Sequence, residues 1–462
     1  MKIEFATTAG GIAGMSGGRL AAGSADTVVT TITTDSRELG ERSFFIPLAG
    51  EKFDGHDYIE ALANSGKIVG FLSARESDRD IAERTGTACV LCADTLKAFG
   101  SMGSRRRDEI NPTVIGVTGT NGKTTTKELI WSVLEKKYPV LKNEKNYNNE
   151  VGVPYTLLHL DKRYEMAVIE MGMNHPGEIE RLSLMAKPDV AVITNAGEGH
   201  LEFLGSVENV ARAKSEILAG MKPGSTLFLN RDTRQFDLLC GAARDKEMNV
   251  VTFGISDSAN IRPDEYVLDE KGVTISLDGI GYYLPLYGIH NVYNAVAAIA
   301  VARHFDVNAG IVRDALASFQ NIDMRSQIIE KEYVVINDAY NSNPLSSRYA
   351  LMSAAAVYAG RRKIAVLGDM KELGAESARY HRETGQAAAE CGFDMLVAVG
   401  DMARHYADGA TGAGMPVDCV QAFQTRSEAI SYLRGALRER DVVLVKGSRS
   451  MKMEEIADAL VR

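Results

Sequence analysis

The amino-acid sequence predicts an α/β fold divided into three domains, and three observations support this. The chain has 462 residues, enough for roughly three domains of about 150 residues each. From about residue 112 onward, short apolar segments that suit strands alternate with longer segments that suit helices, which is the pattern of a parallel sheet. One of these strand-like segments runs into a glycine-rich loop. We expect domains at residues 1–111, 112–322 and 323–462.

Composition narrows the class of protein. Hydrophobic residues make up 45% of the chain and charged residues 24%, as in ordinary globular proteins. No apolar run reaches the ~20 residues that a membrane helix needs, and the N-terminal residues lack the apolar core of a signal peptide. The net charge of −9 argues against a general nucleic-acid binder. We therefore expect a cytoplasmic protein that binds neither nucleic acid nor membrane, with the basic residues for any anionic substrate gathered in its site.

The predicted first domain carries short strands and polar turns. Residues 28–33 alternate like a strand, and a polar loop at 50–57 precedes a helix at 58–65. Ser36 and Arg37 follow the strand, where they could grip a phosphate or a uracil, although alone such residues more often form a turn.

The end of this domain is predicted from a charge run and a chain break. Arg105–Arg107 is interpreted as a solvated linker, because Asn111 and Pro112 then interrupt the chain.

The second domain opens with a strand, a glycine-rich loop and a helix. Residues 112–117 suit a buried strand, and apolar residues at helical spacing follow at 129–134. Glycines let backbone N–H groups curl around phosphate oxygens, and a helix N-terminus adds partial positive charge. Lys123 could then reach the β- and γ-phosphates, and the Thr124 hydroxyl could ligate Mg²⁺. The loop residues predicted to bind the nucleotide are Gly119, Thr120, Asn121, Gly122, Lys123, Thr124 and Thr125.

This phosphate loop departs from the general pattern at one position. The pattern has a glycine five residues before Gly122, where this chain has Val117. A glycine-rich turn that caps an ordinary helix is therefore the alternative interpretation. We favour phosphate binding because the strand, the loop, Lys123 and three consecutive threonines are all in place.

Two polar groups are expected on the same rim as Lys123. One predicted strand ends at Glu170, and the next, at 188–193, runs into a loop that contains His200. In open α/β sheets the ligand binds beyond the carboxyl ends of the strands. Either residue alone would usually be structural. Because they share a phosphate-binding rim, we favour Glu170 and His200 as Mg²⁺ ligands or as groups that support the ligands.

Lys214 falls on the apolar side of a predicted helix that begins near Ser206. It lies four residues after Val210 and four before Leu218, so it shares their stripe. A lysine in such a position usually snorkels, with its stem buried and its ammonium in water. Alternatively, its surroundings favour the neutral amine, which can add carbon dioxide to give an anionic carbamate that binds Mg²⁺. The residues alone favour the first interpretation.

The second domain ends with an antiparallel edge and a helix. Short strands with turn signals between residues 249 and 285 predict the edge. A long alanine-rich helix then begins near residue 288, with His290 and Asn291 at its start. These two residues could cap the helix or face a nucleotide base.

The predicted third domain has four apolar strands, each followed by a polar loop. The strands lie at residues 333–336, 363–367, 394–399 and 441–445. We therefore expect a C-terminal Rossmann-like sheet beside a central P-loop mononucleotide-binding parallel sheet. No Gly-x-Gly-x-x-Gly opens this domain, so a nicotinamide cofactor is not expected. The loops offer carboxylates, amides and cations: Asp338, Asp369, Asn341, Asn343, Lys446 and Arg449.

Together these motifs resemble the Mur ligases of bacterial cell-wall synthesis, and the resemblance covers nearly the whole chain. The loops at 337–344 and 368–374 look like those of the ligase of the last step. Asp35-Ser-Arg37 with Phe53-Asp-Gly-His56 resembles the family's uridine-nucleotide-binding domain. The other matching segments are residues 119–125, 148–150, 170–173, 194–200, the helix of Lys214, and 290–294.

The resemblance implies an ATP-dependent ligase that joins D-alanyl-D-alanine to UDP-N-acetylmuramoyl-tripeptide. ATP would transfer its γ-phosphoryl group to the terminal carboxylate of the tripeptide, and the amine of D-Ala-D-Ala would attack the acyl phosphate. Such a reaction needs charge neutralised between a carboxylate and a triphosphate. The implied cofactors are ATP and two Mg²⁺ ions, and we expect a monomer.

The resemblance also assigns residues to roles. Lys123, Glu170, His200 and Lys214 are the implied catalytic residues. Thr124 and Glu170 would hold one Mg²⁺, while His200 and a carbamylated Lys214 would hold or support the second. Asn291 and Arg325 would meet the adenine and ribose, and Asp338 the ribose hydroxyls. The residues expected to contact the substrates are Ser36, Arg37, Phe53, Asp54, His56, Asn148, Asn149, Asn341 and Asn343.

Two other functions are considered. A sister ligase such as folylpolyglutamate synthase shares the chemistry, but the uridine-type first domain argues against it. A phosphate-loop switch or motor would couple ATP hydrolysis to a protein or nucleic acid. The third domain, with its substrate-like loops, argues against that class.

Overall fold

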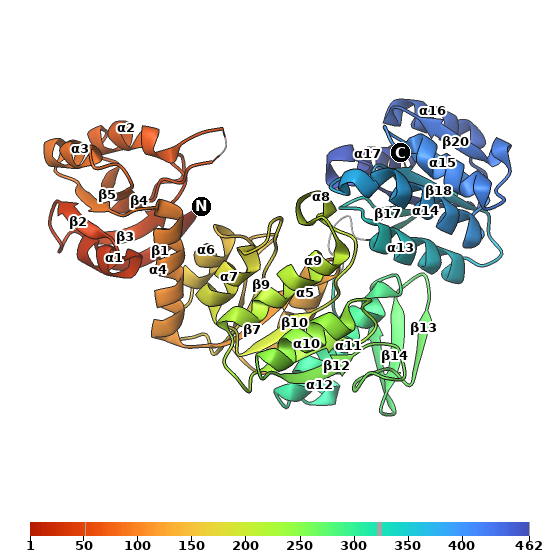
Figure 1. Ribbon diagram of the computed structural model, residues 1–462, viewed down its shortest axis with the longest axis horizontal. Helices are drawn as coiled ribbons and strands as arrows, with labels where there is room; N and C mark the ends of the chain where they lie inside the picture. Colours follow the sequence, from red (N-terminus) through yellow and green to blue (C-terminus); the bar gives the residue numbers. More distant parts are fainter. Residues whose placement is uncertain (51, 321–325, 462) are drawn as a thin grey trace.

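A computed structural model describes residues 1–50, 52–320 and 326–461. It forms three lobes that follow one another along the chain, from the N-terminal lobe through the central lobe to the C-terminal lobe (Figure 1). Each lobe is built on a six-stranded sheet with helices packed against it, and a small three-stranded sheet adjoins the central lobe. The predicted α/β class, with separate N-terminal, central and C-terminal sheets, is confirmed.

The first sheet has the order β1-β3-β4-β5-β6-β2, with antiparallel strands at both edges and parallel pairing between. The predicted strand at 28–33 is β3, and the predicted helix at 58–65 is mainly α2. Its elements are β1 (Lys2–Thr8), α1 (Ala9–Ser16), β2 (Arg19–Ala22), β3 (Val28–Thr33), β4 (Ser43–Phe45), η1 (Gly55–Tyr58), α2 (Ile59–Asn64), β5 (Ile68–Ser73), α3 (Asp78–Thr85), β6 (Ala88–Leu91) and α4 (Thr95–Ile110).

The arginine run is not a solvated linker, which corrects the prediction. It belongs to α4, the long helix that leads from the first lobe to the central one in Figure 1. Arg107 is buried and donates hydrogen bonds to the carbonyls of Ala186 and Lys187, both at 3.0 Å, and to the side chain of Asn111. Its guanidinium also lies 3.3 Å from Asp189. This arginine therefore fastens the first domain to the central sheet.

The central sheet is parallel throughout, in the order β12-β11-β10-β7-β9-β8. Its middle strand β7 pairs with β9 on one side and with β10 on the other, which brings the carboxyl ends of these three strands together. Its elements are β7 (Thr113–Thr118), α5 (Lys123–Leu134), β8 (Val140–Lys142), α6 (Gly152–Leu158), β9 (Met166–Glu170), α7 (Glu178–Ala186), β10 (Val190–Ile193), α8 (Leu201–Leu204), α9 (Val207–Ser215), η2 (Glu216–Gly220), β11 (Thr226–Asn230), α10 (Phe236–Asp245), β12 (Asn249–Phe253), α11 (His290–His304) and α12 (Ala309–Ala317).

The segment from 249 to 285 differs from the predicted antiparallel edge. Its first strand, β12, extends the central sheet in parallel, because it follows the crossover helix α10. The rest forms a separate antiparallel sheet of β13 (Glu265–Leu268), β14 (Val273–Leu277) and β15 (Ile280–Leu284).

The C-terminal sheet has the order β16-β17-β21-β18-β19-β20, and only β16 is antiparallel to its neighbour. All four predicted strands are present, and β16 and β20 were missed. Its elements are β16 (Gln327–Glu330), β17 (Val334–Asp338), α13 (Pro344–Val357), β18 (Lys363–Gly368), η3 (Gly374–Glu376), α14 (Ser377–Glu390), β19 (Met395–Val399), α15 (Ala403–Gly412), η4 (Val417–Cys419), β20 (Val420–Phe423), α16 (Arg426–Ala436), β21 (Val442–Lys446), η5 (Arg449–Met451) and α17 (Glu454–Val461).

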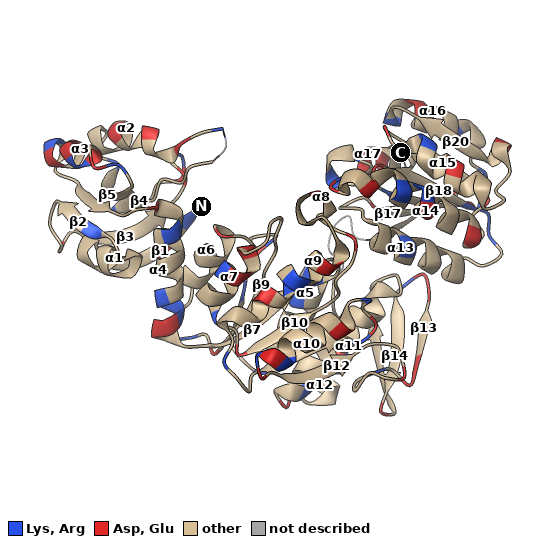
Figure 2. Ribbon diagram, in the orientation of Figure 1, with Lys and Arg blue, Asp and Glu red and all other residues tan. Residues whose placement is uncertain are grey.

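Charged residues are distributed over the whole fold. Basic and acidic residues are interspersed over all three lobes in the view of Figure 2. Within the described ranges, no helix combines the length and the apolar character needed to cross a bilayer. The predicted domain limit at 322/323 lies outside the described residues.

Candidate active site

The phosphate loop joins β7 to α5 as predicted. Gly119 and Gly122 have φ angles of 155° and 80°, which side chains disfavour, and α5 begins at Lys123. A β-carbon on Gly119 would lie 1.8 Å from the hydroxyl oxygen of Thr194, so only glycine allows the loop to pack on the end of β10. Val117, which replaces the expected glycine, lies inside β7. The loop is therefore shorter than the general pattern and begins at Gly119.

The ammonium group of Lys123 folds over its own loop. Its Nζ donates hydrogen bonds to the carbonyls of Gly119 (2.8 Å) and Thr120 (3.2 Å). The backbone N–H of Asn121 donates to Oδ1 of Asn195, which ties the loop to the segment after β10. A cation and the N-terminus of α5 thus stand at the carboxyl end of the sheet, where an anion binds well.

Glu170 ends β9 beside the phosphate loop, because its strand pairs with β7 in the register that sets it next to Val117. The side chain is 1% exposed, and its Oε1 accepts a hydrogen bond from Asn148 at 2.7 Å. Its Oε2 is buried without a hydrogen-bond donor among the described residues. A buried carboxylate oxygen without a donor is unfavourable, and a bound cation would satisfy it.

His200 pairs across to the C-terminal domain. It has a φ of 56°, at the start of α8, and its Nδ1 lies 2.7 Å from Oε2 of Glu372. The backbone N–H of Glu202 donates to the carbonyl of the same glutamate at 3.0 Å. The imidazole beside it lowers the pKa of the Glu372 carboxyl. Glu372 was not predicted, although it stands in the loop after β18 whose motif was recognised.

Lys214 is buried rather than snorkelling. It lies in α9, which begins after an N-cap at Ser206 as predicted, and only 2% of the residue is exposed. Burial holds the pKa of its amine well below the usual value, and the charge of Lys123 acts in the same direction. Within the described residues no carboxylate lies within ion-pair distance of its Nζ. The surroundings therefore favour the neutral amine.

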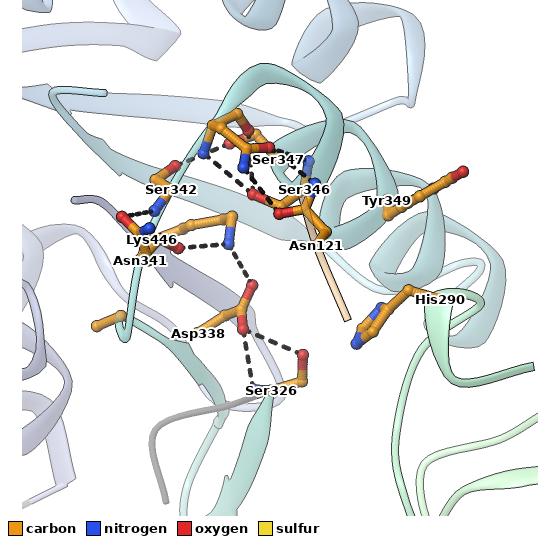
Figure 3. Close-up of polar contacts among 12 residues, drawn as sticks. Asn121, His290, Ser326, Asp338, Asn341, Ser342, Ser346, Ser347, Tyr349 and Lys446 are labelled. Atoms are coloured by element: carbon orange, nitrogen blue, oxygen red, sulfur yellow. Dashed lines mark hydrogen bonds and ion pairs between the residues drawn. The ribbon is translucent and has the colours of Figure 1, made fainter. Parts of the chain in front are cut away.

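An ion pair joins the carboxyl ends of β17 and β21. Lys446 is 2% exposed, and its Nζ lies 2.6 Å from Oδ2 of Asp338 and donates to the carbonyl of Asn341 at 3.0 Å. The other oxygen of Asp338 accepts from the backbone N–H of Ser326 at 3.0 Å (Figure 3). Lys446 thus ties the end of β17, where Asp338 stands, to the following loop, where Asn341 stands.

Two asparagines join the phosphate loop to the C-terminal domain. The side-chain amides of Asn121 and Asn343 exchange hydrogen bonds of 3.1 and 2.7 Å. Asn343 also caps α13, since its Oδ1 accepts from the N–H of Ser346. In Figure 3, Asn121 reaches the loop of the C-terminal domain while His290 faces the same space from α11. Both polar atoms of the Asn343 side chain are therefore engaged within the protein.

These elements enclose two hollows between the central and C-terminal domains. An inner cavity lies between the phosphate loop, the start of α11 and the loop after β17, and is lined by residues that include Asn121, Asn291, Asp338 and Tyr349. Asn291 is buried, and its Nδ2 donates to the carbonyl of Tyr287.

The second hollow is an outer cleft of about 1050 Å³. Lys123, Thr124 and His200 line it from the central domain. The C-terminal domain contributes Lys371, Glu372, Ser448 and Arg449. Lys371 and Ser448 were missed by sequence reasoning, although both follow predicted strands.

The predicted substrate residues of the first domain lie in two segments, one after β3 and one around the start of η1. The exposed guanidinium of Arg37 pairs with the carboxylate of Asp35 at 2.7 Å, next to the half-buried Ser36. Nδ1 of His56 lies 2.6 Å from Asp54, and its Nε2 accepts from the N–H of Ala74. The proton of His56 is therefore assigned to Nδ1.

Phe53 precedes Asp54 in the second segment and is 61% exposed, which is unusual for a large aromatic residue. Asn149 lies in the loop before α6. Oδ1 of Asn149 caps the turn before α6 by accepting from the N–H groups of Val151 and Gly152. Arg325 lies outside the described residues.

Family models of the Mur ligases match three stretches of the chain. The Mur ligase family catalytic domain matches residues 28–98, the Mur ligase middle domain residues 117–302, and the Mur ligase, glutamate ligase domain residues 324–449. The chain is similar to UDP-N-acetylmuramoyl-tripeptide–D-alanyl-D-alanine ligase of Bacillus subtilis, with 35% identity over 94% of each chain. It is 32% identical to the ligase of that name from Escherichia coli, again over 94% of each.

Solved structures agree with these relatives. MurF from Acinetobacter baumannii superposes with a TM-score of 0.89 at 31% identity, covering 99% of this chain and all of that one. MurF from Thermotoga maritima in complex with ADP superposes with a TM-score of 0.80 at 26% identity, over 93% and 96% of the two chains. By these matches over nearly its full length, the chain belongs to the Mur ligase family.

Proposed function

We propose that the protein is an ATP-dependent ligase that joins D-alanyl-D-alanine to UDP-N-acetylmuramoyl-tripeptide in peptidoglycan synthesis. The observation that carries the proposal is the outer cleft. It brings Lys123 and Thr124 of a phosphate loop opposite Lys371 and Arg449 of a second domain. Such a cleft suits a reaction between a triphosphate and two further substrates that carry carboxylates. Relatives named for this reaction match along 94% of the chain.

The proposed chemistry proceeds through an acyl phosphate. A carboxylate oxygen of the tripeptide attacks the γ-phosphorus of ATP, and ADP leaves. The amine of D-Ala-D-Ala then adds to the activated carbonyl, loses a proton, and expels phosphate as the amide forms. Lys123, at the N-terminus of α5, would neutralise charge that develops on the transferred phosphoryl group.

Mg²⁺ fits the residues at the phosphate loop. Mg²⁺ is commonly held by one or two protein groups together with substrate phosphates and water. Thr124 and the buried Oε2 of Glu170 would supply such groups, and the ion would draw negative charge from the phosphates. In the described ranges no cluster of three or more His, Cys, Asp or Glu side chains could hold a metal alone, which suits an ion that arrives with the nucleotide.

Lys214 would act as a carbamate. Its neutral amine would form a bond to the carbon of carbon dioxide and release a proton, which leaves an anionic group close to Lys123. The supporting observations are its burial, its lowered pKa and the lack of a described carboxylate partner. The carbamate and His200 would then support a second Mg²⁺ on the acyl side.

The incoming dipeptide would bind to the C-terminal wall of the cleft. Lys371 and Arg449 are cations on that wall, paired with Asp369 at 2.8 Å and with Glu454 at 2.7 Å, and they would exchange or share these partners to hold the carboxylate of D-Ala-D-Ala. Asn341 stays a candidate contact. Asn343 is a weaker one, since its side chain is occupied by Asn121 and by α13. The nucleotide base and ribose would enter the inner cavity near Asn291 and Asp338.

The test is phosphate release from ATP and Mg²⁺ with UDP-N-acetylmuramoyl-tripeptide, with and without D-Ala-D-Ala. We expect release only when both substrates are present, together with a UDP-linked pentapeptide product. Release with neither substrate would favour a switch or motor. Release with folate substrates instead would favour a sister ligase. The cytoplasmic location and the monomeric state stay predictions, and the proposed reaction implies a part in cell shape and division.

A further inference from the structure

A second buried lysine lies behind the phosphate loop. Lys127 is on α5, one turn after Lys123, and its side chain is fully buried. Its Nζ donates to the carbonyl of Asn143 at 2.7 Å and lies 2.9 Å from Oε1 of Glu128. The nearer oxygen of Glu170, Oε2, lies 4.0 Å away. No role for this lysine follows from the phosphate-loop motif.

Asn143 connects Lys127 to the backbone of Glu170. The side chain of Asn143 is buried and brackets that residue, since its Nδ2 donates to the Glu170 carbonyl and its Oδ1 accepts from the Glu170 N–H, both at 2.9 Å. The same Nδ2 also donates to the carbonyl of Tyr147. The ammonium of Lys127 holds Asn143 through its carbonyl. Lys127 therefore fixes the end of β9 without touching the cleft.

The carboxylate of Glu170 is held from two sides. Asn148 donates to Oε1, and the charge of Lys127 stands behind Oε2. Oε2 has no hydrogen-bond donor in the described parts of the chain, so the position of this oxygen depends on its surroundings and on the ion it would bind. Residues that orient a metal ligand commonly change metal affinity by about 10- to 100-fold when they are replaced.

We propose that Lys127 is a positioning residue that orients Glu170, through Asn143 and through its own charge, for a divalent cation bound with ATP. The inference rests on the proposed function in one respect, the use of Glu170 as a cation ligand. It predicts that Lys127 sets the affinity for the ion. The kcat at saturating Mg²⁺ should change much less than the affinity for the ion.

The test compares Lys127→Met with a matched control, Lys142→Met. Lys142 pairs with the same Glu128. Although it precedes Asn143 in the chain, its side chain makes no hydrogen bond or ion pair with Asn143 or Glu170 among the described residues. Binding of Mn²⁺ would be titrated by electron paramagnetic resonance with the full-length protein and a non-hydrolysable ATP analogue, after subtraction of an analogue-only blank. Phosphate release would be measured in parallel against Mg²⁺ concentration.

We expect Lys127→Met to raise the dissociation constant for Mn²⁺ and the half-saturating Mg²⁺ concentration by about 10- to 100-fold, with kcat at saturating Mg²⁺ within a few-fold of wild type. Lys142→Met should leave both metal constants unchanged. A folded Lys127→Met protein with wild-type metal constants would overturn the proposal. So would an equal shift in the control.

A second variant decides the question if Lys127→Met does not fold. Lys127→Arg keeps the charge, but its planar guanidinium cannot reproduce the contact of a single ammonium with Asn143. It should raise the metal constants by a smaller factor, and unchanged constants would overturn the proposal. Wild-type protein that binds Mn²⁺ with the nucleotide but forms no pentapeptide would contradict the proposed function alone. Wild-type protein that forms pentapeptide and a Lys127 variant with normal metal constants would contradict this inference alone.

Discussion

The central domain buries two lysines that differ in their partners. Lys127 has Glu128 at 2.9 Å, a backbone carbonyl at 2.7 Å and Glu170 at 4.0 Å. Lys214 is equally buried, yet the described residues offer its amine no carboxylate at ion-pair distance, and burial lowers its pKa. Burial alone therefore does not decide what a lysine does. Partners at ion-pair distance favour the charged form of the first lysine, and their lack favours the neutral amine of the second.

The pKa of Glu128, the partner of Lys127, reflects the charges around it. Burial would raise the pKa of Glu128, but the charges of Lys127 and Lys142 outweigh burial and hold it below the usual value. Glu128, Lys127 and Lys142 thus form a charge network beside the phosphate loop. Variants at Lys127, Lys214 and Lys142 test whether a buried lysine with charged partners differs from one without them.

The largest effect is expected for the stability of Lys127→Met. This variant leaves Glu128 and Glu170 with less compensation, and breaking a buried pair costs about 3–5 kcal/mol. Unfolding of the central domain can be followed by urea titration with the fluorescence of Trp131, the single tryptophan of the chain, which lies on the same helix. Lys214→Met, the matched variant, should be as stable as wild type or more stable by about 1 kcal/mol, since it removes an unpaired buried amine. Equal losses of stability in both variants would show that charged partners do not set the contribution of a buried lysine to stability.

The next effect concerns activity. Lys214→Ala should lower kcat by about 10²- to 10³-fold, the size of effect seen when one group that stabilises transition-state charge is removed. Added acetate or formate should restore part of the rate, because a small carboxylate can occupy the place of the carbamate. Phosphate release with both substrates is the measurement. An unchanged rate in Lys214→Ala, with no effect of either anion, would rule out the carbamate.

The pH dependence of stability gives a further contrast. The pKa of Lys214 is lower in the folded protein than its usual value of 10.5, so the unfolded chain binds one more proton between these two values. Stability should therefore rise with pH across that window, by up to about 1.4 kcal/mol per pH unit, and level off above about 10.5. In buffer free of carbon dioxide, the wild-type protein should show this slope relative to Lys214→Met. Parallel pH profiles would contradict the lowered pKa.

The smallest effect is expected for Lys142→Met. This lysine pairs with Glu128 and lies over the ring of Trp131, with its Nζ 3.4 Å from the ring centre, but its side chain is 23% exposed. Pairs of this kind contribute about 1 kcal/mol or less. The urea midpoint should shift slightly, while the emission of Trp131 should change because the cation is lost. A loss as large as that of Lys127→Met would show that exposure does not separate the two lysines.

Sequence reasoning placed residues correctly in those parts of the chain where a motif coincides with the end of a strand. The β7–loop–α5 unit follows from its glycines and helical spacing, and Glu170 was placed on its rim because parallel strands share their carboxyl edge. The apolar stripe of α9 correctly predicted that Lys214 faces inward. Its burial could not be told from snorkelling, since that depends on what covers the helix.

Long-range contacts account for what was missed. Lys127 follows the phosphate loop like an ordinary helical residue, and its partner Asn143 stands in a loop 16 residues further on. The prediction of a solvated Arg107 is wrong because its acceptors lie about 80 residues away in the sequence. The strand β20 is short and half-buried, which gives no strong pattern. Local sequence carries none of this information.

The Arg107 anchor has a consequence for how substrates are chosen. Because the guanidinium ties α4 to the central sheet, a bound helix and not a free linker sets the spacing between the phosphate loop and the first-domain segments that carry Arg37 and His56. Under the proposed function, the uridine end of the substrate is held at one end of this spacing and its reacting carboxylate at the other. The two domains would then select substrates by the length of the peptide. A peptide one residue too short or too long would bind by its nucleotide and still present its carboxylate at the wrong place.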